Sequence, residues 1–160
     1  MIQLKHSDRK TSEQSGDIQR FLKAQMNMYE TALAEIKQGH KQSHWIWYVF
    51  PQLKGLGRTY NSNFYGITDL AEAKEYLKEP TLRARLLEPC DILLQKPHND
   101  ATIIFGKLDA KKLRSSMTLF DLAEPNSIFA NVLTKYFNGK RCVRSLRIFN
   151  KTSFDFISES

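Results

Sequence analysis

Three polar residues recur about one helical turn apart in the segment 109–120: Asp109, Lys112 and Ser116. They border an apolar stripe formed by Leu113, Met117 and Phe120. Because Lys112 and Ser116 are four residues apart, both side chains can point at one object. An ammonium beside a hydroxyl suits a phosphate or a carboxylate. The alternative is that Lys112 only pairs with Asp109 and Ser116 fills space, and the sequence leaves both readings open.

The segment 43–57, SHWIWYVFPQLKGLG, contains both tryptophans of the chain. Its rings, together with Gln52, Lys54 and Arg58, can stack a flat ligand and neutralise its phosphate. The alternative is a purely structural aromatic core. We expect a mixed outcome, with core residues (Trp45, Val49, Phe50), a pocket face (His44, Trp47, Gln52) and a mobile basic rim from Lys54 to Arg58.

Gln25 is a polar residue on the apolar stripe predicted for the first helix. A buried amide must find hydrogen-bond partners or it costs about 1–3 kcal/mol. One reading is a structural glutamine bonded to nearby backbone. The other is that Gln25 faces the ligand pocket together with Tyr29.

The standard catalytic and metal-binding motifs are not found in this sequence. It contains no GxSxG elbow, no phosphate loop and no His/Cys cluster at metal-ligand spacing, so we predict no metal site, and no particular cofactor is indicated. If the predicted pocket is catalytic, His44 or Asp109 is the candidate acid/base, because only these two can transfer protons usefully there. Whether the protein is an enzyme stays open.

Positive charge is concentrated near the C-terminus. The formal net charge is +7, and the segment 135–151 holds six basic residues and no acidic one. In the amphipathic helix predicted there, Arg141, Arg144 and Arg147 face outward, while Cys142, Val143, Leu146 and Phe149 face inward. Such a face could bind nucleic acid or an acidic partner. The plain alternative is a solvated helix surface.

Length and composition predict a single domain. The chain has 160 residues, no apolar run long enough for a membrane span and no N-terminal apolar stretch like that of a signal peptide. We therefore expect a cytoplasmic protein whose two cysteines, Cys90 and Cys142, stay thiols and pack as small hydrophobes. Residues 1–16 are predicted to be a disordered tail and residues 17–160 one helical domain.

The periodicity of apolar residues predicts an all-α domain of about seven or eight short helices. The expected starts and stops are Asp17 and Gly39 for the first helix, a capping box at Asp69, a first-turn Pro80, a cap at Asp109 and a stop at Asn138–Gly139. Residues 101–105 are β-branched and could form a strand, but no partner strand is visible.

The same segments carry a family resemblance that runs in collinear order from about residue 17 to 149. It rests on Arg20–Phe21 with Gln25 and Tyr29, on Ser43–Gly57, on Tyr65–Ile67, on Leu70–Leu77 and on Phe105–Phe120. In these motifs the chain resembles the domain-of-unknown-function family eighteen-ten. The resemblance implies a bacterial, cytoplasmic, mainly helical protein with one compact domain, and it implies no established biochemical role.

Two segments depart from that family's pattern. Glu79–Pro80 stands where a His–Pro start is typical, and the segment Arg141–Arg144 lacks the expected aspartate and threonine. The sequence thus favours a small anionic ligand, such as a nucleotide, bound by Gln25, Tyr29, Trp47, Gln52, Lys54, Arg58, Lys112 and Ser116. The alternatives are a nucleic-acid or acidic-partner module using the C-terminal arginines, and an interaction protein without a small-molecule site.

Overall fold

The structure is a computed structural model that describes the backbone of residues 17–159 and the side chains of residues 17–151. The tail predicted for residues 1–16 lies outside the described residues. Residues 17–159 form eight helices: α2 (Gln19–Gln38), α3 (Ile46–Val49), α4 (Tyr60–Phe64), α5 (Leu70–Lys78), α6 (Pro80–Gln95), α7 (Ala101–Ala123), α8 (Ile128–Phe137) and α9 (Val143–Glu159). The predicted all-α class is confirmed.

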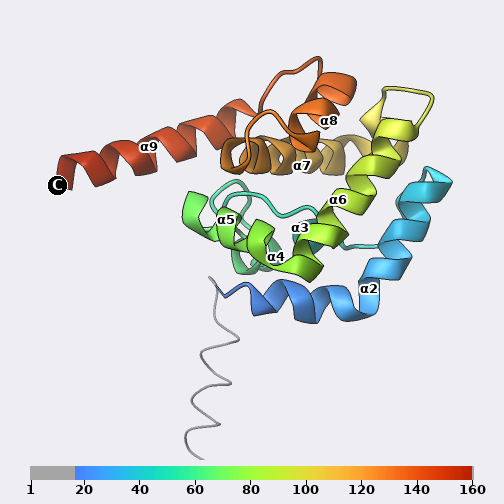
Figure 1. The fold of residues 1–160 in the computed structure, drawn as a ribbon, viewed down its shortest axis with the longest axis horizontal. Helices are drawn as coiled ribbons and strands as arrows, with labels where there is room; N and C mark the ends of the chain where they lie inside the picture. Colours follow the sequence, from blue (N-terminus) through green and yellow to red (C-terminus); the bar gives the residue numbers. More distant parts are fainter. Residues whose placement is uncertain (1–16, 160) are drawn as a thin grey trace, which may run out of the picture.

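Helix α7 is the element on which most of the others are assembled. It contacts α3, α5, α8 and α9, while α6 joins α2, α5 and α8 (Figure 1). The start of α9 packs on α7, and the rest of α9 extends beyond it in the view of Figure 1. Among the described residues, no helix combines the length and apolarity needed to cross a bilayer.

Several helix ends lie where the capping pattern places them. Gly39 ends α2 in the left-handed conformation, with φ 86°. The Asp69 carboxylate accepts a hydrogen bond from the backbone N–H of Glu72 at 2.8 Å, and Pro80 is the first residue of α6. At the start of α2 the Asp17 carboxylate accepts from the N–H of Gln19 at 2.8 Å. Short-range capping chemistry therefore sets these ends.

The start of α7 differs from the expectation. Residues 101–105 are helical, because Asp100 caps them by accepting a 2.9 Å hydrogen bond from the N–H of Thr102. The helical path is then broken at Gly106, which has φ 78° and ψ 168°. Asp109 is therefore not the cap of this helix but lies three residues past the kink, in the first turn of the second segment.

The core is rich in aromatic side chains. Trp45 is fully buried and packs against Phe50 and Phe105, whose ring centroids lie 6.4 and 6.3 Å from its own. Val49 is also buried, so the predicted core part of the aromatic segment is confirmed. This cluster joins the segment after α2 to the first half of α7.

A buried ion pair fixes α2 against α5. The Arg20 guanidinium lies 3.0 Å from the Glu72 carboxylate, and both residues are buried. Arg20 also donates to the backbone carbonyls of Asp17, Phe64 and Gly66, and Glu72 accepts from the N–H of Thr68. These extra bonds satisfy the two charges, which is the condition under which burial of such a pair is tolerated.

The Gly106 kink leads to a prediction about stability. In a regular helix, Gly→Ala stabilises by about 1 kcal/mol. At Gly106 a Cβ would meet no atom within 4 Å, but φ and ψ lie in a region that is almost restricted to glycine. Gly106→Ala should therefore destabilise the protein by about 1–3 kcal/mol in urea denaturation. An increase in stability would show that α7 is continuous in solution.

Candidate functional site

The aromatic segment is held in place by one carboxylate of α2. Glu35 accepts hydrogen bonds from the N–H of Gln42 at 2.8 Å, from the N–H and hydroxyl of Ser43 at 2.9 and 2.6 Å, and from the Trp45 indole at 2.9 Å. Burial acts to raise the pKa of Glu35, but these donors outweigh it and lower the pKa to about 2. The charged carboxylate thus fixes the chain just before Trp47.

Backbone pairing then orients Gln52. The N–H of Ile67 donates to the carbonyl of Gln52 at 2.9 Å, and the N–H of Lys54 donates to the carbonyl of Ile67 at 2.8 Å. In this short extended stretch successive side chains point to opposite sides. Leu53 enters the core, and the Gln52 side chain lines a cavity on the other side.

A close contact between the basic loop and α4 shapes the next part of the wall. Thr59 caps α4 by accepting from the N–H of Ser62 at 3.1 Å. A Cβ at Gly57 would come within 2.4 Å of the Ser62 hydroxyl. Only glycine therefore lets the loop lie this close to α4.

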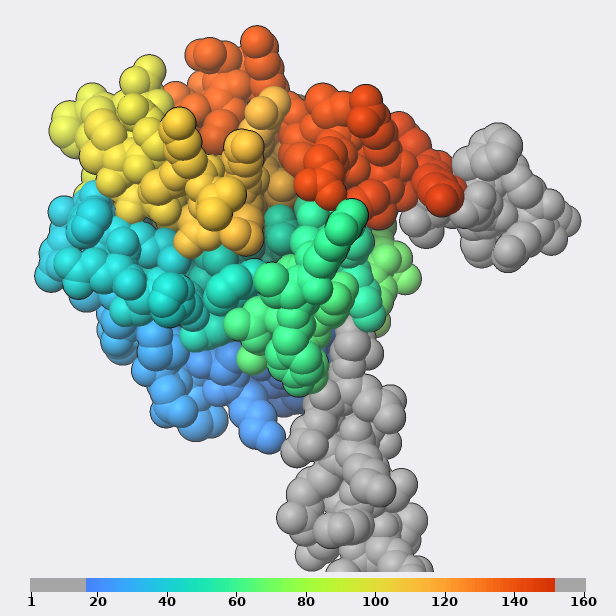
Figure 2. Space-filling view, turned by 180° about the vertical axis from the view of Figure 1, so that it is seen from behind, coloured from blue at the N-terminus to red at the C-terminus, as the bar shows by residue number. Residues whose placement is uncertain are grey.

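The opposite wall comes from α7 and the start of α9. Arg144 donates to the carbonyl of Leu56 at 3.0 Å, which ties α9 to the basic loop. Cys142 donates its N–H to the Thr118 hydroxyl at 2.9 Å, which ties the start of α9 to α7. Figure 2 shows the face on which the teal segment, the yellow-to-orange α7 and the red-orange start of α9 meet.

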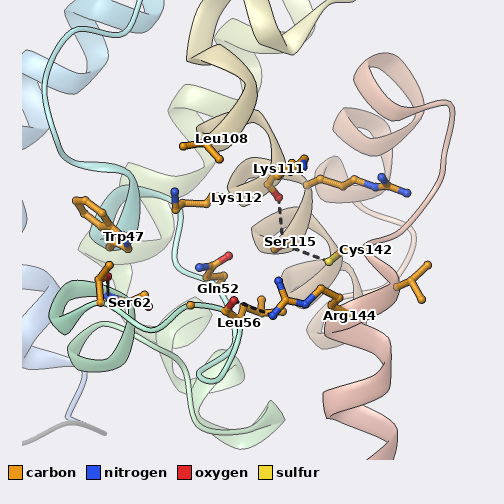
Figure 3. A pocket seen from close by; sticks show the side chains of 14 residues that line it. Trp47, Gln52, Leu56, Ser62, Leu108, Lys111, Lys112, Ser115, Cys142 and Arg144 are labelled. Carbon is orange, nitrogen blue, oxygen red and sulfur yellow. Dashed lines mark hydrogen bonds between the residues drawn. The ribbon is translucent and has the colours of Figure 1, made fainter.

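These walls enclose an open cavity of about 500 Å³. It is lined by Trp47, Gln52, Leu56, Gly57, Thr59, Ser62, Leu108, Lys111, Lys112, Arg114, Ser115, Cys142, Val143 and Arg144. Figure 3 shows Trp47 and Ser62 on one side, Ser115, Cys142 and Arg144 on the other, and the Gln52 amide between them. The size is that of a small-molecule site.

The lining holds polar groups without a partner among the described residues. The Gln52 residue is only 6% exposed, and it lines the cavity. The indole N–H of Trp47 and the hydroxyl of Ser62 are buried and unpartnered. Buried donors of this kind cost free energy until an acceptor meets them.

The charge of the lining is positive. Four basic residues and no acidic residue line the cavity: Lys111, Lys112, Arg114 and Arg144. The Lys112 ammonium lies 5.9 Å from the Trp47 ring centroid and 3.1 Å from the Asp109 carboxylate. Arg114 is bonded only to backbone carbonyls, those of Lys140 and Arg141, so its charge is not compensated by an acid.

The two candidate acid/base residues lie outside this lining. Asp109 pairs with Lys41 at 2.6 Å and with Lys112 at 3.1 Å. Burial acts to raise its pKa, but the hydrogen bonds and charges of these two lysines lower it. Asp109 is therefore an ionised partner of the lysines at neutral pH, which suits a positioning role better than proton transfer. His44 is exposed.

Gln25 and Tyr29, predicted ligand-binding residues, do not line the cavity. The Gln25 amide donates to the carbonyl of Tyr48 at 2.6 Å and to the Tyr76 hydroxyl at 3.0 Å. Tyr29 donates to the Glu88 carboxylate, and burial together with Glu88 raises the pKa of Tyr29. Both residues join α2 to neighbouring elements, as the structural reading proposed for Gln25.

The remaining predicted ligand-binding residues fall into two groups, those that line the cavity and those that do not. Trp47, Gln52 and Lys112 come together in the cavity, whereas the exposed Lys54 and Arg58 do not line it. Ser116 is fully buried and its neighbour Ser115 lines the cavity instead. The reason is that residues 115–121 of α7 are buried on all sides by neighbouring helices, so a single stripe does not describe this segment.

The three C-terminal arginines do not share one outward face. Arg141 pairs with the Asp121 carboxylate, and Arg144 lines the cavity. Arg147 is exposed, without a partner among the described residues. Val143, expected to face inward, is 54% exposed.

Sequence reasoning missed Lys111, Arg114, Ser115 and Cys142 as lining residues. The sequence pattern predicts Cys142 as a small hydrophobe inside the last helix, whereas α9 begins at Val143 and Cys142 occupies the capping position before it. The positions of Lys111 and Arg114 give no periodic signal that distinguishes them from solvated surface residues.

Comparison with known proteins identifies the family of this chain. The family model described as "Protein of unknown function (DUF1810)" matches residues 15–149. The chain belongs to this family. This confirms the resemblance drawn from the sequence motifs. No curated protein matches the chain.

A solved structure shares the fold. The crystal structure of the conserved hypothetical protein Rv1873 from Mycobacterium tuberculosis superposes with a TM-score of 0.81 at 39% sequence identity. The match covers 84% of this chain and 97% of that one. Neither the family description nor the description of this structure names a biochemical function, so the function is argued from the geometry of the cavity.

The hydrogen-bonded Glu35 carboxylate predicts that the stability of the fold depends on pH. Because the folded pKa lies below the ordinary value of 4.5, the charged carboxylate stabilises the fold above about pH 4.5, and this contribution is lost as the pH falls toward about 2. Glu35→Gln should lower stability by about 1.5–3 kcal/mol at neutral pH and flatten this acid dependence. Urea titrations at several pH values measure both effects. The exposed Glu30, on the same helix, provides the matched control Glu30→Gln. Equal losses in both variants would contradict the assignment.

Proposed function

We propose that this protein binds a small anionic ligand in the cavity between residues 47–62, α7 and the start of α9. The observation that carries the proposal is the lining itself: four cationic residues, no acidic residue and unpartnered buried donors around about 500 Å³. Oxygen atoms of a phosphate or carboxylate accept from all of these groups.

Net charge around the cavity supports an anion even when ion pairs are counted. Asp109 neutralises one of its two lysine partners, Lys41 and Lys112. Lys111, Arg114 and Arg144 keep their charges, since none of them has an acidic partner among the described residues. An anion that enters therefore meets uncompensated positive charge from α7 and from the start of α9.

The donors favour a ligand that reaches across the cavity. The Gln52 amide and the Trp47 indole belong to one wall, and the Lys111 ammonium belongs to the other. A phosphate on a flat group, as in a mononucleotide, combines a negative charge that the lysines attract with a flat surface that can pack against the Trp47 side. We therefore include nucleotides among the expected ligands.

The test is binding of inorganic phosphate, pyrophosphate and AMP to the full chain, by thermal shift and calorimetry at low ionic strength. A ligand that binds only the folded state raises the melting temperature, by an amount that grows with the logarithm of its concentration divided by its Kd. Lys111→Gln should weaken binding about tenfold, because it removes one charge-assisted contact of roughly 1.4 kcal/mol or more. Lys111 is chosen because its ammonium has no partner among the described residues.

Arg147→Gln is the matched control, since it removes the same charge from an exposed position outside the lining. It should leave anion binding unchanged. Failure of all three anions to bind at millimolar concentration would overturn the proposal. If instead duplex DNA binds in low salt and Arg147→Gln weakens it, the nucleic-acid alternative replaces the anion site.

A further inference from the structure

Cys142 occupies a special position at the edge of the cavity. It directly precedes α9, and its carbonyl accepts the N–H of Leu146 at 3.1 Å, as expected for an N-cap residue. Serine, threonine, aspartate and asparagine are the usual caps, because their oxygen accepts the free N–H groups of the first turn. Here a sulfur atom takes that place.

Hydrogen-bond donors come to this sulfur from Ser115 and from the first turn of α9. The Ser115 hydroxyl lies 3.2 Å from Sγ. The backbone N–H groups of Arg144 and Ser145, in the first turn of α9, also act to lower the pKa of the thiol. Burial acts to raise the pKa of the Cys142 thiol, but the hydrogen bonds outweigh burial and lower it below its ordinary value. The N-terminus of a helix favours a thiolate for the same reason.

The Ser115 hydroxyl can respond to the charge on sulfur. Its single hydrogen lies within reach of two acceptors, the carbonyl of Lys111 at 3.1 Å and the sulfur of Cys142. Beside a protonated thiol the hydroxyl donates to the carbonyl and accepts the S–H. Beside a thiolate it turns and donates to sulfur.

The charged groups around Cys142 are mainly basic. On α7 they are Lys111, Lys112, Arg114 and Asp121, and on its own segment they are Lys140, Arg141 and Arg144. The one carboxylate of this set, Asp121, is paired with Arg141. Anionic reagents are therefore drawn toward the sulfur.

Independent of the cysteine, the cavity shows a built binding site. Ser62 lines the cavity and is 5% exposed, and its hydroxyl has no hydrogen-bond partner among the described residues; it lies across the cavity from Ser115 and Cys142 (Figure 3). The other thiol offers a contrast. Cys90 is fully buried, 3.8 Å from the Met117 sulfur, and burial raises its pKa. Such a thiol is inert.

We propose that Cys142 is a modification site that undergoes thiol–disulfide exchange with small anionic disulfides. Its thiolate attacks one sulfur of R–S–S–R, a bond forms between Sγ and that sulfur, and the S–S bond of the reagent breaks. The second half leaves as RS⁻ and takes a proton from solvent according to its own pKa. Cys142 is oxidised and the released half is reduced, so electrons balance. The charge preference rests on the proposed anion site, since both use Lys111 and Arg144.

The test compares two disulfides of opposite charge on the full chain. The reagents are 5,5′-dithiobis(2-nitrobenzoate), a dianion, and cystamine, a dication, each normalised to its rate with N-acetylcysteine at the same pH. We expect one fast thiol, assigned by its loss in Cys142→Ser and its retention in Cys90→Ala. At low salt its normalised preference for the dianion should be at least about tenfold, falling in high salt.

Two variants and one control variant separate the effect of the hydroxyl donor from the effect of the positive charge. Ser115→Ala should move the midpoint of the rate–pH profile upward, because the thiolate loses a donor. Lys111→Gln should reduce the preference for the dianion several-fold and leave the profile in place, whereas Arg147→Gln should change neither. Equal normalised rates for the two reagents, or a fast thiol that survives in Cys142→Ser, would overturn the inference.

Phosphate binding to Cys142→Ser distinguishes this failure from failure of the proposed function. Serine is a good N-cap, so this variant keeps the start of α9. If phosphate still binds to Cys142→Ser but Cys142 of the native chain reacts without charge preference, only the exchange site is refuted. If the native chain shows neither phosphate binding nor charge preference, the anion site is refuted as well.

Discussion

The Glu35 carboxylate is the constraint on which the cavity depends, because it fixes the chain between α2 and α3. Four donors of residues 42–45 converge on it, and one of them is the indole of the central core residue Trp45. Trp45 is held between Phe50 and Phe105, and Trp47 lies near the second half of α7, where the Lys112 ammonium is 5.9 Å from its ring centroid. A buried charge with full hydrogen bonding thus positions the aromatic wall, and burial without those donors would be costly.

The second wall depends on α7, which is buried far more than an ordinary surface helix. Its kink at Gly106 separates the half that packs on Trp45 from the half that carries Lys111 and Lys112. Contacts at the start of α9 then close the cavity: Arg144 reaches the basic loop and Cys142 reaches Thr118. The same few residues therefore hold the fold together, supply the positive charge of the lining and place the thiol beside it. A ligand in the cavity would be affected by all three.

Sequence patterns predicted the features that depend on local chemistry. The all-α class, the Gly39 and Asp69 helix ends and the burial of Trp45, Val49 and Phe50 follow from capping and periodicity. They also brought Trp47, Gln52 and Lys112 together as candidates, because polar residues beside apolar stripes stand out. The choice of Ser116 over Ser115 failed, since a helix packed on several sides has no single buried stripe.

The sequence by itself determined the helices, the aromatic core and the family, because each depends on residues close together in the chain or on collinear motifs. Only the tertiary structure decided which polar groups share a cavity. Gln25 and Tyr29 became structural partners of other helices, Arg144 turned from a surface charge into a lining residue, and Cys142 became a helix cap beside Ser115. These outcomes depend on contacts between residues far apart in sequence, and short-range periodicity carries no information about them.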